Sequence, residues 1–225
     1  MSLHEVGLGL GTFDPIDSGH LNRLVNLMSR VEPRLVSNHL CWNARDGRYF
    51  NDLLPLSYTE EAPRHVAEPT VRVQEVRGRR TPVENVPSYL EFGYAGMSEW
   101  ALPGGLGERV DGGILLDVNN ICINACTHSP EDLECAAAVG PDRVEQLHLA
   151  VHTRREFQDG SVLPVDTRDP PVCAEMWKLH LEAVRRLRFR STLVEWHVHL
   201  PPPWTLEGEA GTADRILEGC HVRVG

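Results

Sequence analysis

Residues 113–120 read Gly-Ile-Leu-Leu-Asp-Val-Asn-Asn, an apolar run that stops abruptly at an acid and two amides. A short segment that is apolar on both faces is typical of a parallel strand covered by helices. Five similar segments recur at intervals of about one βα unit, so that the predicted strands are 6–10, 35–37, 82–83, 113–116, 144–147 and 192–194. The stretches between most of them have helical periodicity. This alternation predicts an α/β fold with a parallel sheet.

Four segments have the apolar spacing of amphipathic helices. We expect them to begin at residue 17 or 18, at 59–61, at 171 and at 205, and the last to end near residue 220. A further helix is expected after Trp100, but residues 102–107 read Leu-Pro-Gly-Gly-Leu-Gly. Proline and glycine disfavour helix, so an irregular segment is predicted at residues 102–107 in place of a regular helix.

Seven segments with strand character end in residues that bind metals. They are His4, His39, Glu84, Asp117, His148, Asp166 and Glu195. In a barrel of parallel strands the C-terminal strand ends meet at one mouth. Buried like charges repel each other and lose hydration, and a cation would neutralise them. Nitrogen and oxygen ligands without thiolates suit iron, manganese or zinc. An acid that follows a strand can instead cap the next helix.

Composition narrows the function classes. The chain has 225 residues with 41% hydrophobic content, enough for one core, and we expect a single domain over residues 1–225. A net charge of −10 disfavours nucleic acid as a partner, and the basic run 77–80 is interpreted as a solvated turn.

No apolar run approaches the roughly 20 residues of a membrane span, and no signal peptide is visible at residue 1, so a cytoplasmic location without a membrane partner is expected. The six cysteines form no CxxC pair and are predicted to be free and partly buried.

Several longer motifs carry a family resemblance. They are Ser-x-His-Leu-x-Trp at 37–42, Glu-Asn-x-x-Ser-Tyr at 84–89, Leu-Leu-Asp-Val-Asn-Asn at 115–120, His-Leu-Ala-x-His at 148–152 and Leu-x-Glu-Trp at 193–196. Together with residues 3–11 and 51–56, these resemble the DUF692 proteins. Those are multinuclear non-heme iron-dependent oxidases with a TIM (β/α)8 barrel of the xylose isomerase-like type. The resemblance covers roughly residues 3 to 220.

The resemblance implies a chemistry and a set of residues. Family members bind two or three iron ions and use O₂ to oxidise residues, often cysteines, in ribosomally synthesised precursor peptides. Many work with a partner protein that recognises the leader of the peptide. The seven strand-end residues would be the iron ligands. Asn119 would ligate iron or support a ligand through a hydrogen bond, and His152 would orient substrate or oxygen, although His152 could equally be a satisfied polar loop residue.

The chain departs from the family pattern at several positions. The family's segments upstream of the His4 motif lie before residue 1, so the resemblance implies a barrel that is incomplete at the N-terminus. The family's Asp-Thr-His reads Asp166-Thr167-Arg168 here, and an arginine stays protonated and cannot replace an imidazole at a cation. One iron position is therefore expected to be weak. Val151 and His197 replace a glycine and an acid of the family pattern.

Two other readings stay open at this point. One is a metal-dependent isomerase or phosphodiester nuclease on the same barrel, since a fold does not fix a function. The other is a divergent, inactive copy that acts only as a binding scaffold.

Overall fold

The computed structural model describes residues 1–90, 92–94, 96–128, 139–187 and 191–221. Their contacts form two compact units, Met1–Leu115 and Leu116–Gly225, and each unit is described by itself. The prediction of a single domain stays a prediction. No helix among the described residues is long and apolar enough to cross a membrane.

Unit 1 contains a parallel sheet whose strands lie side by side in chain order. The strands are β1 (Ser2–Glu5), β2 (Leu35–His39), β5 (Val83–Glu84) and the first two residues of β6 (Ile114–Asp117). Each connection between neighbours contains a helix, which confirms the predicted α/β alternation for this unit. Sequential order in space is what a singly wound barrel requires, because every crossover adds its strand on the same side.

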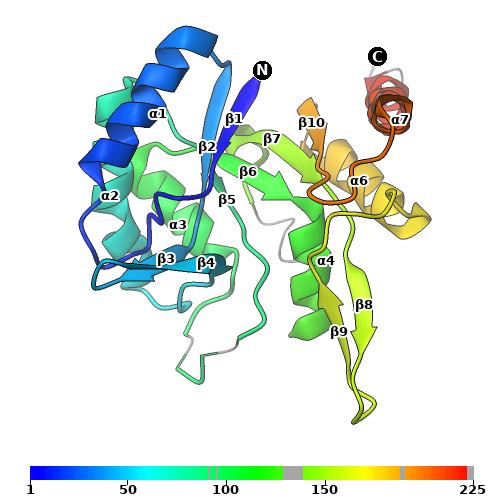
Figure 1. Ribbon diagram of the computed structural model, residues 1–225, viewed down its shortest axis with the longest axis horizontal. Coiled ribbons are helices and arrows are strands. Elements are labelled where there is room, and N and C mark those ends of the chain that lie inside the picture. Colours follow the sequence, from blue (N-terminus) through cyan, green and yellow to red (C-terminus); the bar gives the residue numbers. More distant parts are fainter. Residues whose placement is uncertain (91, 95, 129–138, 188–190, 222–225) are drawn as a thin grey trace. The chain divides into compact units, whose positions relative to one another are not determined.

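Three helices cover this sheet: α1 (Ser18–Val31), α2 (Ala62–Arg77) and α3 (Ala101–Val110). Figure 1 shows α1 and α2 next to each other beside the blue strands β1 and β2. The predicted cap of α1 is confirmed, because the Asp17 carboxylate accepts hydrogen bonds from the backbone N–H groups of Gly19 and His20. The core between sheet and helices includes Leu10, Val66 and Leu106.

The first strand was placed wrongly. The sequence predicted a strand over residues 6–10, whereas β1 ends at Glu5 and the chain turns directly after it. Gly9 has a φ of +54°, a conformation that glycine adopts at little cost and that does not occur in a regular strand, so residues 6–10 cannot form one. Leu8 and Leu10 are buried nonetheless, in the core of unit 1. Their burial made the segment resemble a strand.

The expectation of a damaged helix after Trp100 is also wrong. Residues 101–110 form α3, a regular helix of ten residues. Pro103 lies in its first turn, where a backbone N–H has no partner within the helix in any case. Leu102, Leu106 and Val110 are buried on one face, so packing outweighs the poor helix propensity of the glycines.

Gly104→Ala is therefore expected to stabilise the protein. An added Cβ at Gly104 meets no atom within 4 Å, and the residue is helical. Alanine should raise the free energy of unfolding by about 0.5–1 kcal/mol in chemical denaturation. The matched control is Gly78→Ala at the end of α2, which also has open space but a φ of +66°, so it should destabilise. Equal shifts from the two variants would contradict the assignment of α3.

A hairpin follows β2, with strands β3 (Trp42–Arg45) and β4 (Arg48–Leu54). The carboxylate of Asp14 accepts hydrogen bonds from the N–H groups of Asp46 and Gly47 at its turn. The basic run 77–80 is only partly a solvated turn. Gly78 ends α2 in the left-handed conformation, but Arg77 is buried and donates to Thr81.

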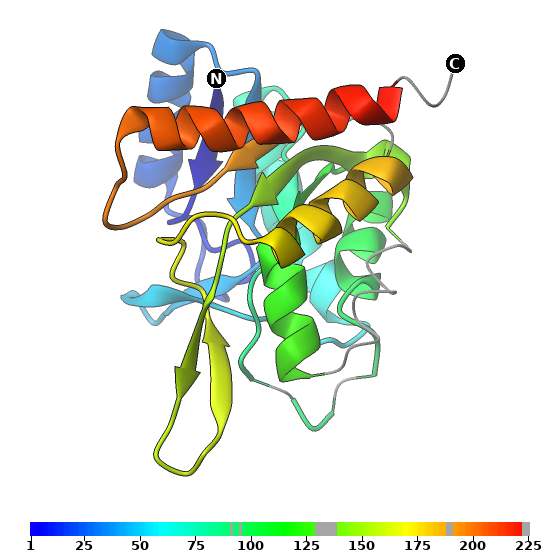
Figure 2. The ribbon, with the colours of Figure 1, turned by 90° about the vertical axis from the view of Figure 1, so that its right-hand side faces the viewer.

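Unit 2 repeats the same scheme. Strands β7 (Val144–Leu149) and β10 (Ser191–Val194) are parallel, and the segment between them contains a hairpin and a helix. The hairpin pairs β8 (Thr153–Glu156) with β9 (Val162–Val165) and projects away from the rest of the unit (Figures 1 and 2). The described residues of the unit include the helices α4 (Val118–Thr127), α6 (Ala174–Leu187) and α7 (Pro203–His221). Figure 2 shows α6 and α7 side by side.

The core of unit 2 lies between α4, β7 and α6 and includes Cys122, Leu149 and Met176. The predictions of helices from residue 171 and from residue 205 are confirmed within three residues, whereas α4 and both hairpins were not predicted. The described cysteines are free, and two of them, Cys41 and Cys122, are buried. Cys135 lies outside the described residues.

Candidate metal sites and the family

Unit 1 brings three of the predicted ligands together. The Nε2 atom of His4 lies 2.6 Å from Oε2 of Glu84, and the Nε2 atom of His39 lies 3.0 Å from the same oxygen. The two Nε2 atoms are 3.0 Å apart. Glu84 and His39 are buried and His4 is partly buried. We call these three residues the unit 1 ligand group.

Strand register explains why these residues meet. His39 and Glu84 are direct partners in the pairing of β2 with β5, at the last residue of each strand. His4 is paired with Ser37, two residues before His39 on β2. Residues two apart on a strand point to the same face, so both imidazoles and the carboxylate share that face.

Hydrogen bonds fix the tautomers of both imidazoles. Nδ1 of His39 lies 2.9 Å from the backbone oxygen of Glu5, which can only accept, so Nδ1 carries the proton. Oγ of Ser37 lies 2.7 Å from Nδ1 of His4 and can accept from that nitrogen while it donates to the carbonyl of Leu3. In the neutral imidazoles Nε2 then carries the lone pair, and this is the form that binds a metal.

The unit 1 ligand group fits a transition metal. Two lone pairs and a carboxylate oxygen face each other at close range, and they repel unless a proton or a cation lies among them. Ligand atoms about 2.1 Å from an ion and at right angles to each other lie about 3.0 Å apart, close to the separations seen here. Burial, with Glu84 and Asp52 nearby, raises the pKa of the Cys41 thiol to about 12, so this thiol is protonated in the metal-free protein.

Unit 2 holds the other four predicted ligands. Asp117 is the last residue of β6, His148 lies in β7, and Glu195 directly follows β10. These three offer ligand atoms within 4.8 Å of one another, and Nδ1 of His148 lies 3.1 Å from Oε1 of Glu195. Asp166 follows β9, a strand of the antiparallel hairpin and not of the parallel sheet.

Asp117, Asp166 and Glu195 share one arginine. Arg168 is buried, and its Nη2 lies 2.9 Å from Oδ2 of Asp117. Its Nε lies 3.0 Å from both carboxylate oxygens of Asp166, and Nη1 forms an ion pair with Glu195. Asp117 also caps α4, because its Oδ1 accepts from the N–H of Asn120. The alternative of an N-cap is thus confirmed for this acid.

The two predicted catalytic residues lie in a chain of hydrogen bonds in unit 2. Nδ2 of Asn119 donates to Oδ1 of Asp166 at 2.8 Å, and Oδ1 of Asn119 lies 3.0 Å from Nδ1 of His152. Since the amide oxygen accepts, Nδ1 of His152 carries the proton. Burial, with the charge of Arg154, lowers the pKa of His152, so its imidazole is neutral and Nε2 can accept a proton.

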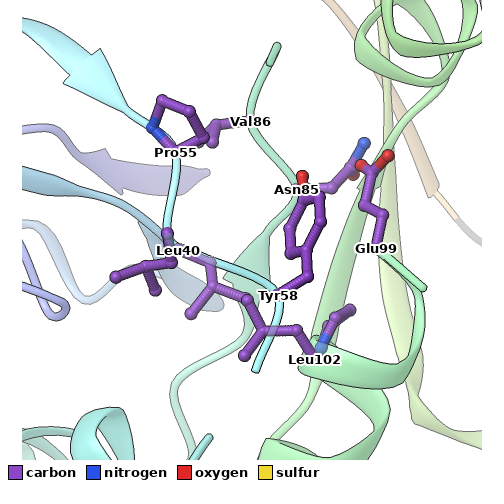
Figure 3. A pocket seen from close by; sticks show the side chains of 9 residues that line it. Leu40, Pro55, Tyr58, Asn85, Val86, Glu99 and Leu102 are labelled. Carbon is purple, nitrogen blue, oxygen red and sulfur yellow. The ribbon is translucent and has the colours of Figure 1, made fainter. Parts of the chain in front are cut away.

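A small cavity in unit 1 adjoins Asn85, the residue after Glu84. Figure 3 shows Tyr58, Asn85 and Glu99 on one side of it and Leu40, Pro55 and Val86 on the other. Its volume of about 20 Å³ has room for roughly one water molecule, too little for a side chain of a peptide.

Comparison with known proteins assigns the chain to a family. Residues 1–218 match the RiPP precursor modification enzymes MbnB/TglH/ChrH, which act on ribosomally synthesised and post-translationally modified peptides. The chain belongs to this family. A UPF0276 protein of Anaeromyxobacter sp. (strain Fw109-5) is 44% identical over 214 residues, which are 95% of this chain and 74% of that protein. A UPF0276 protein of Rhizobium meliloti is 40% identical over 97% of this chain and 71% of its own length. The DUF692 resemblance is thereby confirmed.

Solved structures confirm the fold class. The structure of L-ribulose 3-epimerase matches 99% of this chain and 76% of its own, with a TM-score of 0.61 and 14% identity. A xylose isomerase-like TIM barrel protein from Mycobacterium smegmatis, solved with magnesium, matches 90% of this chain and 67% of its own, with a TM-score of 0.57 and 13% identity. The chain therefore has the xylose isomerase-like TIM-barrel fold. Identities this low carry no function.

Two residues that contact the predicted ligands were not recognised from the sequence as parts of the candidate sites. Ser37 orients His4 through a hydrogen bond. The two residues meet because β1 pairs with β2, and this pairing cannot be read from a single sequence. Arg168 was identified as a non-ligand, but its contacts with three carboxylates were not predicted.

Proposed function

We propose that this family member is an iron- and O₂-dependent oxidase that modifies a residue, cysteine in the first instance, of a ribosomally synthesised precursor peptide. Membership of the family of RiPP precursor modification enzymes supports the peptide substrate. The observation that carries the iron assignment is the unit 1 ligand group. Two imidazoles and one carboxylate on one face are the donor set of non-heme Fe(II) oxygenases.

His4, His39 and Glu84 would hold the iron. When bound, the iron supplies redox chemistry with O₂ and an open position for a soft ligand such as a thiolate. The protein's own contribution is orientation. Ser37 and the carbonyl of Glu5 hold the imidazoles with Nε2 toward Glu84, so little reorganisation accompanies metal binding.

His152 is the candidate base for the substrate. Its neutral imidazole, fixed through Asn119, can take a proton at Nε2 from an incoming thiol, which increases the thiolate fraction. The iron-ligand roles of Asp117, His148, Asp166 and Glu195 stay a prediction, as does a partner protein that recognises the leader of the peptide.

Anaerobic purification followed by metal analysis and turnover tests this proposal. We expect about one iron or more per chain. With a cysteine-containing peptide encoded beside the gene, the iron-loaded protein should take up O₂, and the mass of the peptide should change. With the Cys→Ser variant of the peptide, neither change should occur. Fewer than about one iron per chain, together with no O₂ uptake on such peptides, would refute the oxidase assignment. Turnover with zinc or magnesium in the absence of O₂ would favour the isomerase or nuclease reading instead.

A further inference from the structure

We propose that Arg168 is a built-in cation that takes the place of a metal ion among Asp117, Asp166 and Glu195, so that, among the described ligand groups within each unit, the metal binds at the unit 1 ligand group and not among these three acids. This inference deepens the proposed function, because it concerns how many metal ions the chain carries. It depends on that proposal only through metal binding at unit 1.

The guanidinium is shared among the three acids. Each of its nitrogens has a different partner: Nη2 contacts Asp117, Nε contacts Asp166, and Nη1 contacts Glu195. Nη2 also lies 3.3 Å from the amide oxygen of Asn120. Arginine is suited to such a position because its planar group presents donors in several fixed directions and stays charged when buried.

The backbone holds the guanidinium in this position. Arg168 has a φ of +48°, a conformation that is strained for any residue with a side chain. Its N–H donates to the carbonyl of Val151 at 3.1 Å, and its carbonyl accepts from the N–H of His197 at 2.8 Å. These two backbone hydrogen bonds hold the strained residue in place. The backbone of Arg168 is therefore already ordered, which lowers the conformational entropy that its side chain loses on entering the cluster.

Electrostatics makes the arginine and a metal ion alternatives. Buried carboxylates need a positive partner, and either a guanidinium or a divalent ion can supply it. The guanidinium already binds Oδ2 of Asp117 and both oxygens of Asp166. An ion would have to displace these contacts and would place a second cation beside a fixed one. The donors of unit 2 therefore fit a metal poorly while Arg168 is present.

Metal counting tests this inference without turnover. Metal-free protein is loaded anaerobically with Fe(II), freed from excess metal, and its iron per chain is measured for the wild type and for Arg168→His, Arg168→Lys and Glu195→Gln. All variants at position 168 share the same backbone strain, so their differences report on the side chain. Histidine supplies a neutral donor and removes the cation, whereas lysine keeps the charge.

We expect Arg168→His to bind about one more iron per chain than the wild type, and Arg168→Lys to bind the same number. Glu195→Gln should leave the wild-type count unchanged. The same Fe(II) loading should raise the melting temperature of metal-free Arg168→His by several degrees more than it raises that of the wild type.

Either of two results would overturn the inference. One is a folded Arg168→His chain with the wild-type iron count. The other, which needs no variant at position 168, is a fall in the count for Glu195→Gln while Arg168 is present. If peptide oxidation fails but the counts are as expected, the proposed function fails and this inference stands. A wild-type count of zero that is unchanged in Arg168→His would refute both.

Discussion

Glu84→Gln removes about one iron per chain and abolishes peptide oxidation. Glutamine keeps the shape of the side chain but loses the negative charge. Its neutral amide therefore cannot offset the positive charge of an ion held by the two imidazoles. Loss of a residue that only supports a ligand lowers metal affinity about 10–100-fold, so loss of a ligand should exceed 100-fold. Iron content after anaerobic gel filtration and Fe(II) affinity by competition with a chelator measure the effect.

A matched control is available on β1. Glu5 also forms a pair with a histidine, since its Oε1 lies 2.9 Å from Nε2 of His20, but it is outside the unit 1 ligand group. Glu5→Gln should therefore keep the iron count and the affinity of the wild type. If the two variants lose iron equally, the loss reflects general damage near β1 and not removal of a ligand.

Lowering the pH from 6.5 to 4 destabilises the wild type by about 3 kcal/mol through His180. This imidazole is fully buried in α6, where its Nε2 lies 2.8 Å from Oγ1 of Thr192. Burial lowers its pKa from 6.5 to about 4. Between pH 6.5 and 4, His180 binds a proton more strongly in the unfolded chain than in the folded chain. Stability from this residue is complete above pH 6.5 and falls as the pH drops towards 4.

His180→Gln separates this contribution from those of the other titrating groups. Glutamine can keep the hydrogen bond to Thr192 but does not titrate in this range. Denaturant titration at several pH values measures the free energy of unfolding of both proteins. The difference in this free energy between wild type and variant should shrink as the pH falls. His199→Gln, at an exposed imidazole, should change the slope much less. Parallel curves for wild type and His180→Gln would contradict the assigned burial.

The sequence predicted the fold class because buried parallel strands have a distinctive pattern. Short apolar runs separated by helical periodicity were enough to place β2, β5, β6, β7 and β10. It failed where tertiary contacts outweigh local preference. α3 forms through Pro103 and three glycines because Leu106 and its neighbours are buried, and residues 6–10 are buried without being a strand.

The strand-end positions of the candidate ligands were predictable from the sequence, but the contacts between them were not. His39, Glu84 and Asp117 lie at the last residue of their strands, which the change from apolar to polar residues indicates. Which of them share ligand atoms depends on register and on the loop conformation at Arg168. A φ of +48° at an arginine has no local signature, so the contacts of Arg168 with three acids could not be predicted.

Anomalous X-ray diffraction at the iron absorption edge tests metal binding by the unit 1 ligand group most directly. Crystals of the anaerobically purified protein should show an iron peak bonded to Nε2 of His4, Nε2 of His39 and the carboxylate of Glu84, at the roughly 2.1 Å typical of such ligands. An iron-loaded crystal in which these three side chains carry no peak would contradict the assignment.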